Sequence, residues 1–113
     1  HCGMCRRWGG GPLMFVDCRT DVTFKGEGNI TVYESSDWAE RAFCKKCGSH
    51  LFYRLKHNNA HQMLVGQFKE QENFNFDLQV YMDSKPAFYD FANITRELTE
   101  AEVIEEFGPG QNP

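Results

Sequence analysis

Long apolar runs are missing from this sequence of 113 residues, and their absence excludes a membrane-spanning protein. The longest run, Pro12 to Val16, falls far short of the roughly 18 residues that a transmembrane helix needs. An excess of basic residues is missing too, because 16 acidic residues outnumber 12 basic ones and give a formal net charge of −4. A nucleic-acid-binding protein usually shows the opposite balance. We therefore expect neither a membrane nor a nucleic-acid partner.

The chain is also too short for two hydrophobic cores. Its cysteines are odd in number, so they cannot all form disulfides within one chain. A chain of 113 residues buries about two-thirds of its surface in one modest core, which an additional cross-link or metal would stabilise. Five cysteines is an odd number, and no secretion signal is visible, so we expect reduced thiols in a cytoplasmic protein. Because the sequence starts at His1 rather than Met, we expect either residues upstream or a processed chain.

Short strand-like runs separated by turn residues fill most of the chain. They cover residues 13–16, 22–24, 30–33, 40–44, 51–55, 63–65 and 78–82. The second and third runs flank Gly26-Glu27-Gly28-Asn29, which predicts a β-hairpin.

One helix is predicted near the C-terminus. Thr99-Glu100-Ala101-Glu102 is a capping box, Val103, Ile104 and Phe107 share one side, and Gly108-Pro109 ends the helix. We expect residues 110–113 to fray. The residues therefore predict a mainly β single domain of short antiparallel strands with a short C-terminal helix.

Two C-x2-C pairs are the strongest chemical signal. They are Cys2-Gly3-Met4-Cys5 and Cys44-Lys45-Lys46-Cys47, the second followed by Gly48. At this spacing a tight turn directs both sulfurs at one point, as tetrahedral zinc requires. Disulfides or buried thiols are the alternative, whereas a thioredoxin-like redox pair would need a βαβ unit that is not visible. The residues alone favour one closed structural zinc site formed by Cys2, Cys5, Cys44 and Cys47.

Basic residues stand beside both pairs, namely Arg6, Arg7, Lys45 and Lys46. Four thiolates around Zn²⁺ carry a net charge of about −2, which these residues would offset. The alternative is that some of them bind the carboxylates of an anionic ligand. The glycines at 9–11 either allow a ligand to approach the backbone or form a flexible turn.

The remaining candidates are weaker. Cys18 is expected to be a buried bystander thiol, His50 a polar residue at the start of a strand, and His57 and His61 surface residues near a turn. A solvated helix face is expected for Glu102, Glu105 and Glu106, and Asp83 and Asp90 have no predicted partner.

Three segments carry a resemblance to a known family: His1 to Arg7 (HCGMCRR), Phe43 to Ser49 (FCKKCGS) with Leu51-Phe52, and Gln79 to Asp90 (QVYMDSKPAFYD). Together they resemble the glutathione-dependent formaldehyde-activating family, which also includes centromere protein V. This resemblance covers nearly the whole chain. It implies a zinc-stabilised β-tent fold, with the β domain at residues 1–98 and the helix and tail at 99–113.

The family pattern implies two zinc sites per full-length chain. Members carry C-x-C on an N-terminal strand, then C-H-C-x2-C, then C-x2-C-G; the first and last pairs hold structural zinc and the middle three cysteines hold a reactive zinc. On this pattern Cys2 and Cys5 are catalytic metal ligands, while Cys44 and Cys47 are half of the structural site. The C-x-C strand and the cysteine before His1 are not in this sequence, so the resemblance predicts upstream residues that supply them.

The activity that the resemblance implies is zinc-dependent carbon–sulfur lysis of a glutathione–aldehyde adduct or of another small thiol. Arg6, Arg7 and Trp8 would then contact the carboxylates and carbon chain of glutathione. The alternative is a non-enzymatic, zinc-stabilised binding module. A B-type methionine sulfoxide reductase is disfavoured because no cysteine follows Cys47.

Overall fold

The computed structural model describes residues 1–108, which form two compact units. One unit is Met14–Lys69, and the other joins His1–Leu13 to the chain from Glu70 onward. Among the described residues there are seven strands and two α-helices, so the mainly β fold with a C-terminal helix is confirmed. No described helix has the length and apolar character needed to cross a membrane. The predicted fraying of residues 110–113 falls outside the described residues.

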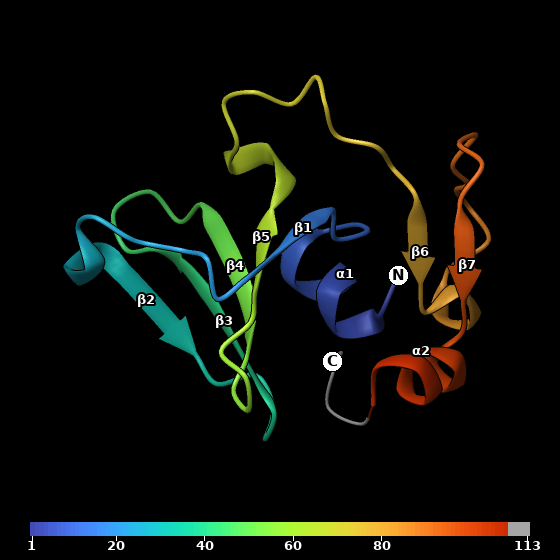
Figure 1. Ribbon diagram of the computed structural model, residues 1–113, viewed down its shortest axis with the longest axis horizontal. Coiled ribbons are helices and arrows are strands. Elements are labelled where there is room, and N and C mark those ends of the chain that lie inside the picture. The colour runs from blue at the N-terminus through green and yellow to red at the C-terminus, as the bar shows by residue number, and fades with distance from the viewer. Residues whose placement is uncertain (109–113) are drawn as a thin grey trace. The chain divides into compact units, whose positions relative to one another are not determined.

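The unit Met14–Lys69 is a five-stranded antiparallel sheet with the strand order β1-β5-β4-β3-β2 (Figure 1). Its strands are β1 (Phe15–Arg19), β2 (Ile30–Tyr33), β3 (Ala39–Cys44), β4 (His50–Leu55) and β5 (His61–Leu64). All five were predicted with small shifts at their ends, the largest at β1, which begins two residues and ends three residues later than expected.

Small residues on one strand make room for large ones on the next in the core of this sheet. Ala39 on β3 is fully buried and clusters with Tyr53 and Leu55 of β4 and with Ala60. Burying a side chain such as Leu55 contributes about 1.5–3 kcal/mol. The β3–β4 hairpin is therefore firmly held, and the Cys44–Cys47 pair lies in its turn.

The predicted hairpin around residues 26–29 is wrong. Residues 22–24 form no strand, Gly26 has a φ of 73°, and Glu27–Asn29 is a turn of 3-10 helix. Strand β2 pairs with β3 instead. The backbone N–H of Lys45 donates to the carbonyl of Asn29 (2.6 Å), which extends the hydrogen bonding between the two strands by one residue. Phe24 contributes its ring, which stacks on Phe52 with centroids 5.3 Å apart.

The other unit contains two strands that run parallel, β6 (Leu78–Val80) and β7 (Arg96–Leu98) (Figure 1). The prediction of antiparallel strands therefore fails for this pair. Strand β7 was not predicted, because Arg96-Glu97-Leu98 lacks the β-branched and aromatic residues that signal a strand.

Helix α2 (Glu100–Phe107) begins at the predicted capping box. The Thr99 hydroxyl accepts from the N–H of Glu102 (3.3 Å), and the Glu102 carboxylate accepts from the N–H of Thr99 (2.9 Å). Val103 is fully buried, whereas Ile104 and Phe107 are more than 40% exposed, so the apolar face is narrower than predicted.

Helix α1 (Gly3–Gly9) was missed, since a tight turn was expected around the first cysteine pair. The N–H of Arg6 donates to the carbonyl of Cys2 (3.0 Å). Gly10 ends the helix with a φ of 85°, and its N–H donates to the carbonyl of Arg6 (2.8 Å). The glycines that suggested a flexible turn thus include the residue that ends the helix.

Candidate functional site

The first cysteine pair lies at the start of α1. Cys2 immediately precedes the helix and Cys5 lies in its first turn, so a separation of three residues brings both thiols to one side. Both are buried in a cluster with Tyr81, Leu98 and Val103. The structure therefore brings Cys2 and Cys5 together in apolar surroundings.

Tyr81 is a neighbour of this pair that sequence reasoning missed. Its backbone has a φ of 58°, which is uncommon for a non-glycine residue. Burial raises the pKa of Tyr81 to about 12, with further contributions from Glu100, Cys2 and Cys5, so its phenol keeps its proton at neutral pH. No local pattern singles out Tyr81, because it continues a strand-like run.

The second cysteine pair lies in the β3–β4 turn. The N–H of Gly48 donates to the carbonyl of Cys44 (2.8 Å), the N–H of Cys44 donates to the carbonyl of Ser49 (2.8 Å), and Gly48 has a φ of 78°. The Cys47 sulfur lies 3.2 Å from the Ser49 hydroxyl oxygen.

These contacts favour the thiolate form of Cys47. The Ser49 hydroxyl and then its backbone N–H lower the pKa of Cys47, and the Cys44 thiol adds to the effect. Because a metal binds cysteine as thiolate, this turn fits a pair of zinc ligands.

Two thiolates are half of the four ligands that a tetrahedral zinc ion needs. Cys2 and Cys5 belong to one compact unit, whereas Cys44 and Cys47 belong to the other. In the part of the chain that the structure describes, no group of three or more His, Cys, Asp or Glu side chains is arranged to hold a metal ion. The assignment of these four cysteines as zinc ligands therefore stays a prediction.

Cys18 differs from the four paired cysteines. All five cysteines lie within residues 1–108, and none of them forms a disulfide. Cys18 is half-buried on β1 rather than fully buried as predicted. Burial and the carboxylates of Asp17 and Asp21 raise its pKa, so it stays a protonated thiol.

The histidines of the sheet unit follow the prediction in two cases of three. His50 begins β4, and His57 is exposed in a turn. His61, expected at the surface, is instead 5% exposed, because its ring packs edge-on against Phe52 (centroids 4.8 Å apart). Its Nδ1 hydrogen bond to the carbonyl of Asn59 (3.0 Å) satisfies the buried ring.

An open pocket of about 520 Å³ lies beside α1. Arg6 and Arg7 line it together with residues of the glycine-rich segment and two aromatic residues, so cationic and aromatic residues share the lining. Trp8, predicted as a third ligand-binding residue, is half-buried and is not among the lining residues. The full lining is Gly3, Arg6, Arg7, Gly10, Gly11, Pro12, Phe88 and Tyr89.

The two arginines of this pocket differ in their contacts. Arg6 donates from Nε to the carbonyl oxygen of His1 (3.0 Å) and from Nη2 to that of Ser84 (3.2 Å). Arg7 is exposed at the pocket. Much of the donor capacity of Arg6 is therefore used to hold the chain, whereas Arg7 presents its charge to solvent.

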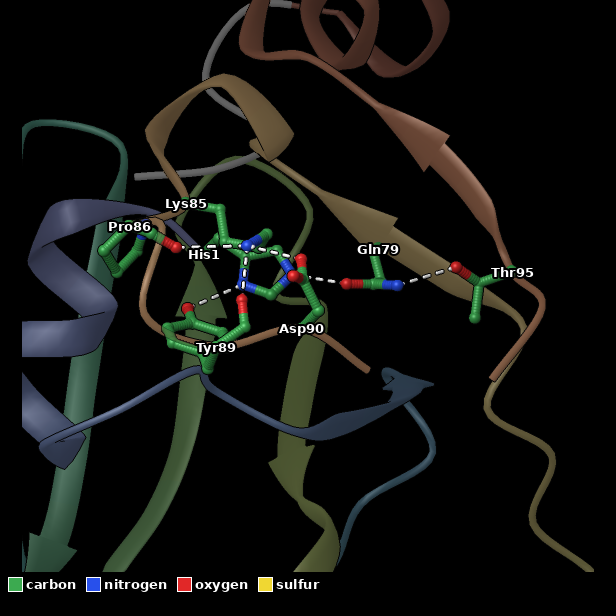
Figure 2. A network of polar contacts seen from close by, with 7 residues as sticks. All are labelled: His1, Gln79, Lys85, Pro86, Tyr89, Asp90 and Thr95. Atoms are coloured by element: carbon green, nitrogen blue, oxygen red, sulfur yellow. Dashed lines mark hydrogen bonds and ion pairs between the residues drawn. The ribbon is translucent and has the colours of Figure 1, made fainter. Parts of the chain in front are cut away.

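His1 is the centre of a polar network that sequence reasoning missed (Figure 2). Its ring is buried, with Nδ1 2.8 Å from the Tyr89 hydroxyl and Nε2 2.7 Å from Oε1 of Gln79. Gln79 in turn donates to the Thr95 hydroxyl (2.9 Å). The network ties the residue before Cys2 to β6 and to the segment that contains Tyr89.

The segment 85–90 is held by a half-buried ammonium group. Lys85 donates to the carbonyls of Pro86 (3.0 Å) and Tyr89 and pairs with Asp90 (2.8 Å; Figure 2). Asp90 thus has a partner, and so does Asp83, which accepts from the N–H of Glu100 (3.0 Å). These contacts hold the backbone next to Phe88 and Tyr89, which line the pocket.

Comparisons with known proteins identify the family of this chain. A family model described as glutathione-dependent formaldehyde-activating enzyme matches residues 1–84. A protein of Schizosaccharomyces pombe (strain 972 / ATCC 24843), named as an uncharacterized lyase, is 40% identical over 105 residues, which are 92% of this chain and 77% of that protein. A comparison with solved structures found no significant match. The chain therefore belongs to the glutathione-dependent formaldehyde-activating family.

Proposed function

We propose that this protein is a zinc-dependent carbon–sulfur lyase that acts on the adduct of glutathione with an aldehyde, or on a similar adduct of another small thiol. The observation that carries the proposal is the neighbourhood of α1, where a buried pair of cysteines is followed at once by two arginines that line an open pocket. Family membership and the lyase name of the yeast relative support the reaction class.

The proposal assigns the four paired cysteines to zinc. Cys2 and Cys5 would be two ligands of the reactive ion, and Cys44 and Cys47 two ligands of a structural one. A zinc ion bound by thiolates would stabilise the substrate sulfur as a thiolate. The lowered pKa of Cys47 and the pairing of Cys2 with Cys5 on one side of α1 support these assignments.

The chain's own residues bind and orient the adduct. The exposed guanidinium of Arg7 at the pocket attracts the carboxylates of the thiol, while Arg6 holds the carbonyl groups of His1 and Ser84. The apolar cluster around Cys2 and Cys5 limits the access of water to their thiols.

In the lysis direction the carbon–sulfur bond of the adduct breaks, and its electron pair stays on sulfur. The hydroxyl group on the same carbon loses its proton and becomes the carbonyl of the released aldehyde. The products are a thiolate, an aldehyde and a proton, and the reverse direction forms the adduct.

Exchange NMR of glutathione mixed with formaldehyde tests this function. The zinc-loaded protein should speed the exchange between free and hydroxymethylated glutathione above the spontaneous rate. Cys5→Ser should abolish the acceleration while the fold remains, and Cys18→Ser should retain it. If the folded, zinc-loaded protein neither accelerates the exchange nor binds glutathione, the lyase proposal is wrong and the protein is a zinc-stabilised binding module.

A further inference from the structure

Gln79 on β6 is buried and contacts the residue that immediately precedes Cys2. Its Oε1 lies 2.7 Å from Nε2 of His1 (Figure 2). We propose that Gln79 is a positioning residue for the reactive zinc ion, because it fixes His1 and thereby the backbone from which Cys2 projects. This inference rests on the proposed function, since that function assigns Cys2 and Cys5 to the reactive ion. Gln79 acts through His1 and is not itself a ligand.

The two cysteines are held by different parts of the backbone. Cys5 lies in the first turn of α1, so the helix itself fixes its backbone. Cys2 precedes the helix and has an extended backbone, with a φ of −56° and a ψ of 141°. The helix has seven residues, and helices of this length are marginal without support from their surroundings. The position of the Cys2 sulfur relative to that of Cys5 therefore depends on how the preceding residue is held.

His1 is held at its backbone and at its ring. Its backbone nitrogen donates to the carbonyl of Val80 on β6 (3.2 Å), and its carbonyl accepts from Nε of Arg6 on α1 (3.0 Å). These bonds alone leave the residue free to pivot about them, and the contacts at the ring remove that freedom. Nδ1 lies 2.8 Å from the hydroxyl of Tyr89, which belongs to a segment outside the helices and strands. Gln79 is therefore the ring partner that a strand supplies.

The side chain of Gln79 is itself oriented before a metal binds. It is 6% exposed, and its amide nitrogen donates to the hydroxyl of Thr95 (2.9 Å), just ahead of β7. Strand β7 pairs in parallel with β6, with Gln79 opposite Glu97. Because the carboxamide is bound at both ends, it cannot rotate without losing a hydrogen bond in a place that little water reaches. Gln79 thus joins His1 firmly to the two-stranded sheet.

Zinc binding is sensitive to such an arrangement. A tetrahedral site needs each sulfur about 2.3 Å from the ion, so thiols that are already in place lose less freedom when the metal binds. Residues that orient metal ligands commonly change the metal affinity roughly 10- to 100-fold when they are replaced. Gln79 acts on Cys2 through one intervening residue. Its loss should therefore weaken the affinity for the reactive ion about tenfold, at the lower end of that range.

Chelator competition on the full-length protein tests this role with zinc itself as the probe. Gln79→Met keeps the length of the side chain and removes its contacts with His1 and Thr95. The affinity for the more readily released zinc should fall about tenfold, whereas the affinity for the other zinc should stay within about twofold. Saturating zinc should restore the acceleration of glutathione exchange, because Gln79 contacts neither the metal nor the substrate. An acceleration that added zinc does not restore would contradict a positioning role.

Thr99→Ala is the matched control for a general loss of stability. It removes a helix cap in the same compact unit and leaves the contacts of Gln79 and His1 in place. This variant should keep the affinity for both zinc ions within about twofold. If Thr99→Ala weakens the reactive site as much as Gln79→Met does, the effect of Gln79 is a loss of stability and the inference fails.

Thr95→Val keeps the inference testable if Gln79→Met does not fold. It removes the hydroxyl that orients the carboxamide and leaves Gln79 in place, so the affinity for the readily released zinc should fall about threefold. Unchanged zinc affinity in Thr95→Val, or in folded Gln79→Met, would overturn the inference and leave the proposed function standing. A wild-type protein that holds only one inert zinc would remove the proposed function as well.

Discussion

The Nε atom of Arg6 donates a hydrogen bond to the carbonyl oxygen of His1 across 3.0 Å. Together with the bond from Nη2 to Ser84, this contact makes Arg6 a brace between the start of the chain and the segment that follows β6. Arg7, the next residue along α1, lines the same pocket and is exposed. Two adjacent arginines thus have separable roles.

Substitution of each arginine by alanine should separate those roles. Arg7→Ala should weaken glutathione binding about tenfold, because a charge-assisted hydrogen bond is lost, and should leave the melting temperature unchanged. Arg6→Ala should instead lower the free energy of unfolding by about 1–3 kcal/mol, because two carbonyl groups lose their donor. Calorimetry and urea unfolding measure the two effects. Equal loss of stability in both variants would contradict this assignment.

The second cysteine pair should be structural. Cys47→Ser should lower the zinc content and unfold the protein, because binding of a structural metal contributes directly to folding free energy. Cys18→Ser is the control, since Cys18 is a half-buried thiol outside both pairs, and it should keep the full zinc content. Metal analysis and circular dichroism give both readouts. Retention of zinc and fold in Cys47→Ser would rule out a structural role for this pair.

Local patterns predicted the sheet and the C-terminal helix well, because they act over a few residues. The strand-like runs of β3 and β4 on either side of a turn and the capping box at Thr99 are both readable from neighbouring side chains. Helix α1 could not be predicted, because a seven-residue helix that begins and ends with glycine has low helix propensity. Its formation depends on the left-handed backbone of Gly10 that ends it. The pairing of β2 with β3 depends on contacts such as Lys45 to Asn29, which no local pattern shows.

The candidate site was predicted only where it is local in sequence. The cysteine pairs and the adjacent Arg6 and Arg7 could be found from spacing, and the structure brings the arginines to one pocket. The network of His1 with Tyr89 joins residues 88 positions apart, and a lone histidine beside a cysteine gives no hint of such a partner. Tyr89 could have been found only by asking why an aromatic pair follows Pro86 in the segment that resembles the family.

The buried His61 makes stability depend on pH. Burial lowers the pKa of His61 below its usual value of 6.5, and the nearby Arg54 acts in the same direction. The unfolded chain therefore binds this proton more readily than the folded chain does. The contribution of His61 is fully present above about pH 6.5 and is lost as the pH falls through the lower pKa of the folded state.

Urea unfolding between about pH 8 and pH 5 tests this linkage. The fall in unfolding free energy should be smaller in His61→Gln than in the wild-type protein, since the variant lacks the group that titrates. His57→Gln, at an exposed turn position, is the control and should follow the wild-type curve. A His61→Gln curve parallel to the wild-type curve over the whole range would show that His61 contributes nothing to the pH dependence.

The capping box at the start of α2 should contribute measurably to stability. Thr99→Ala removes the acceptor of the Glu102 N–H and should cost about 1 kcal/mol of unfolding free energy. Thr99→Ser keeps a hydroxyl at this position and should stay within about 0.5 kcal/mol of the wild-type protein. Equal losses in the two variants, measured by urea unfolding, would assign the effect to the methyl group of Thr99 instead of its hydroxyl.

The zinc dependence of the proposed lyase activity is tested most directly by removing zinc stepwise from the full-length protein with a chelator. The exchange rate of hydroxymethylglutathione is measured at each step. The acceleration should disappear with the first, readily released zinc while circular dichroism still reports a folded chain, and unfolding should accompany loss of the second. Undiminished acceleration in folded protein after zinc release, or no acceleration at full zinc occupancy, would contradict a zinc-dependent carbon–sulfur lyase.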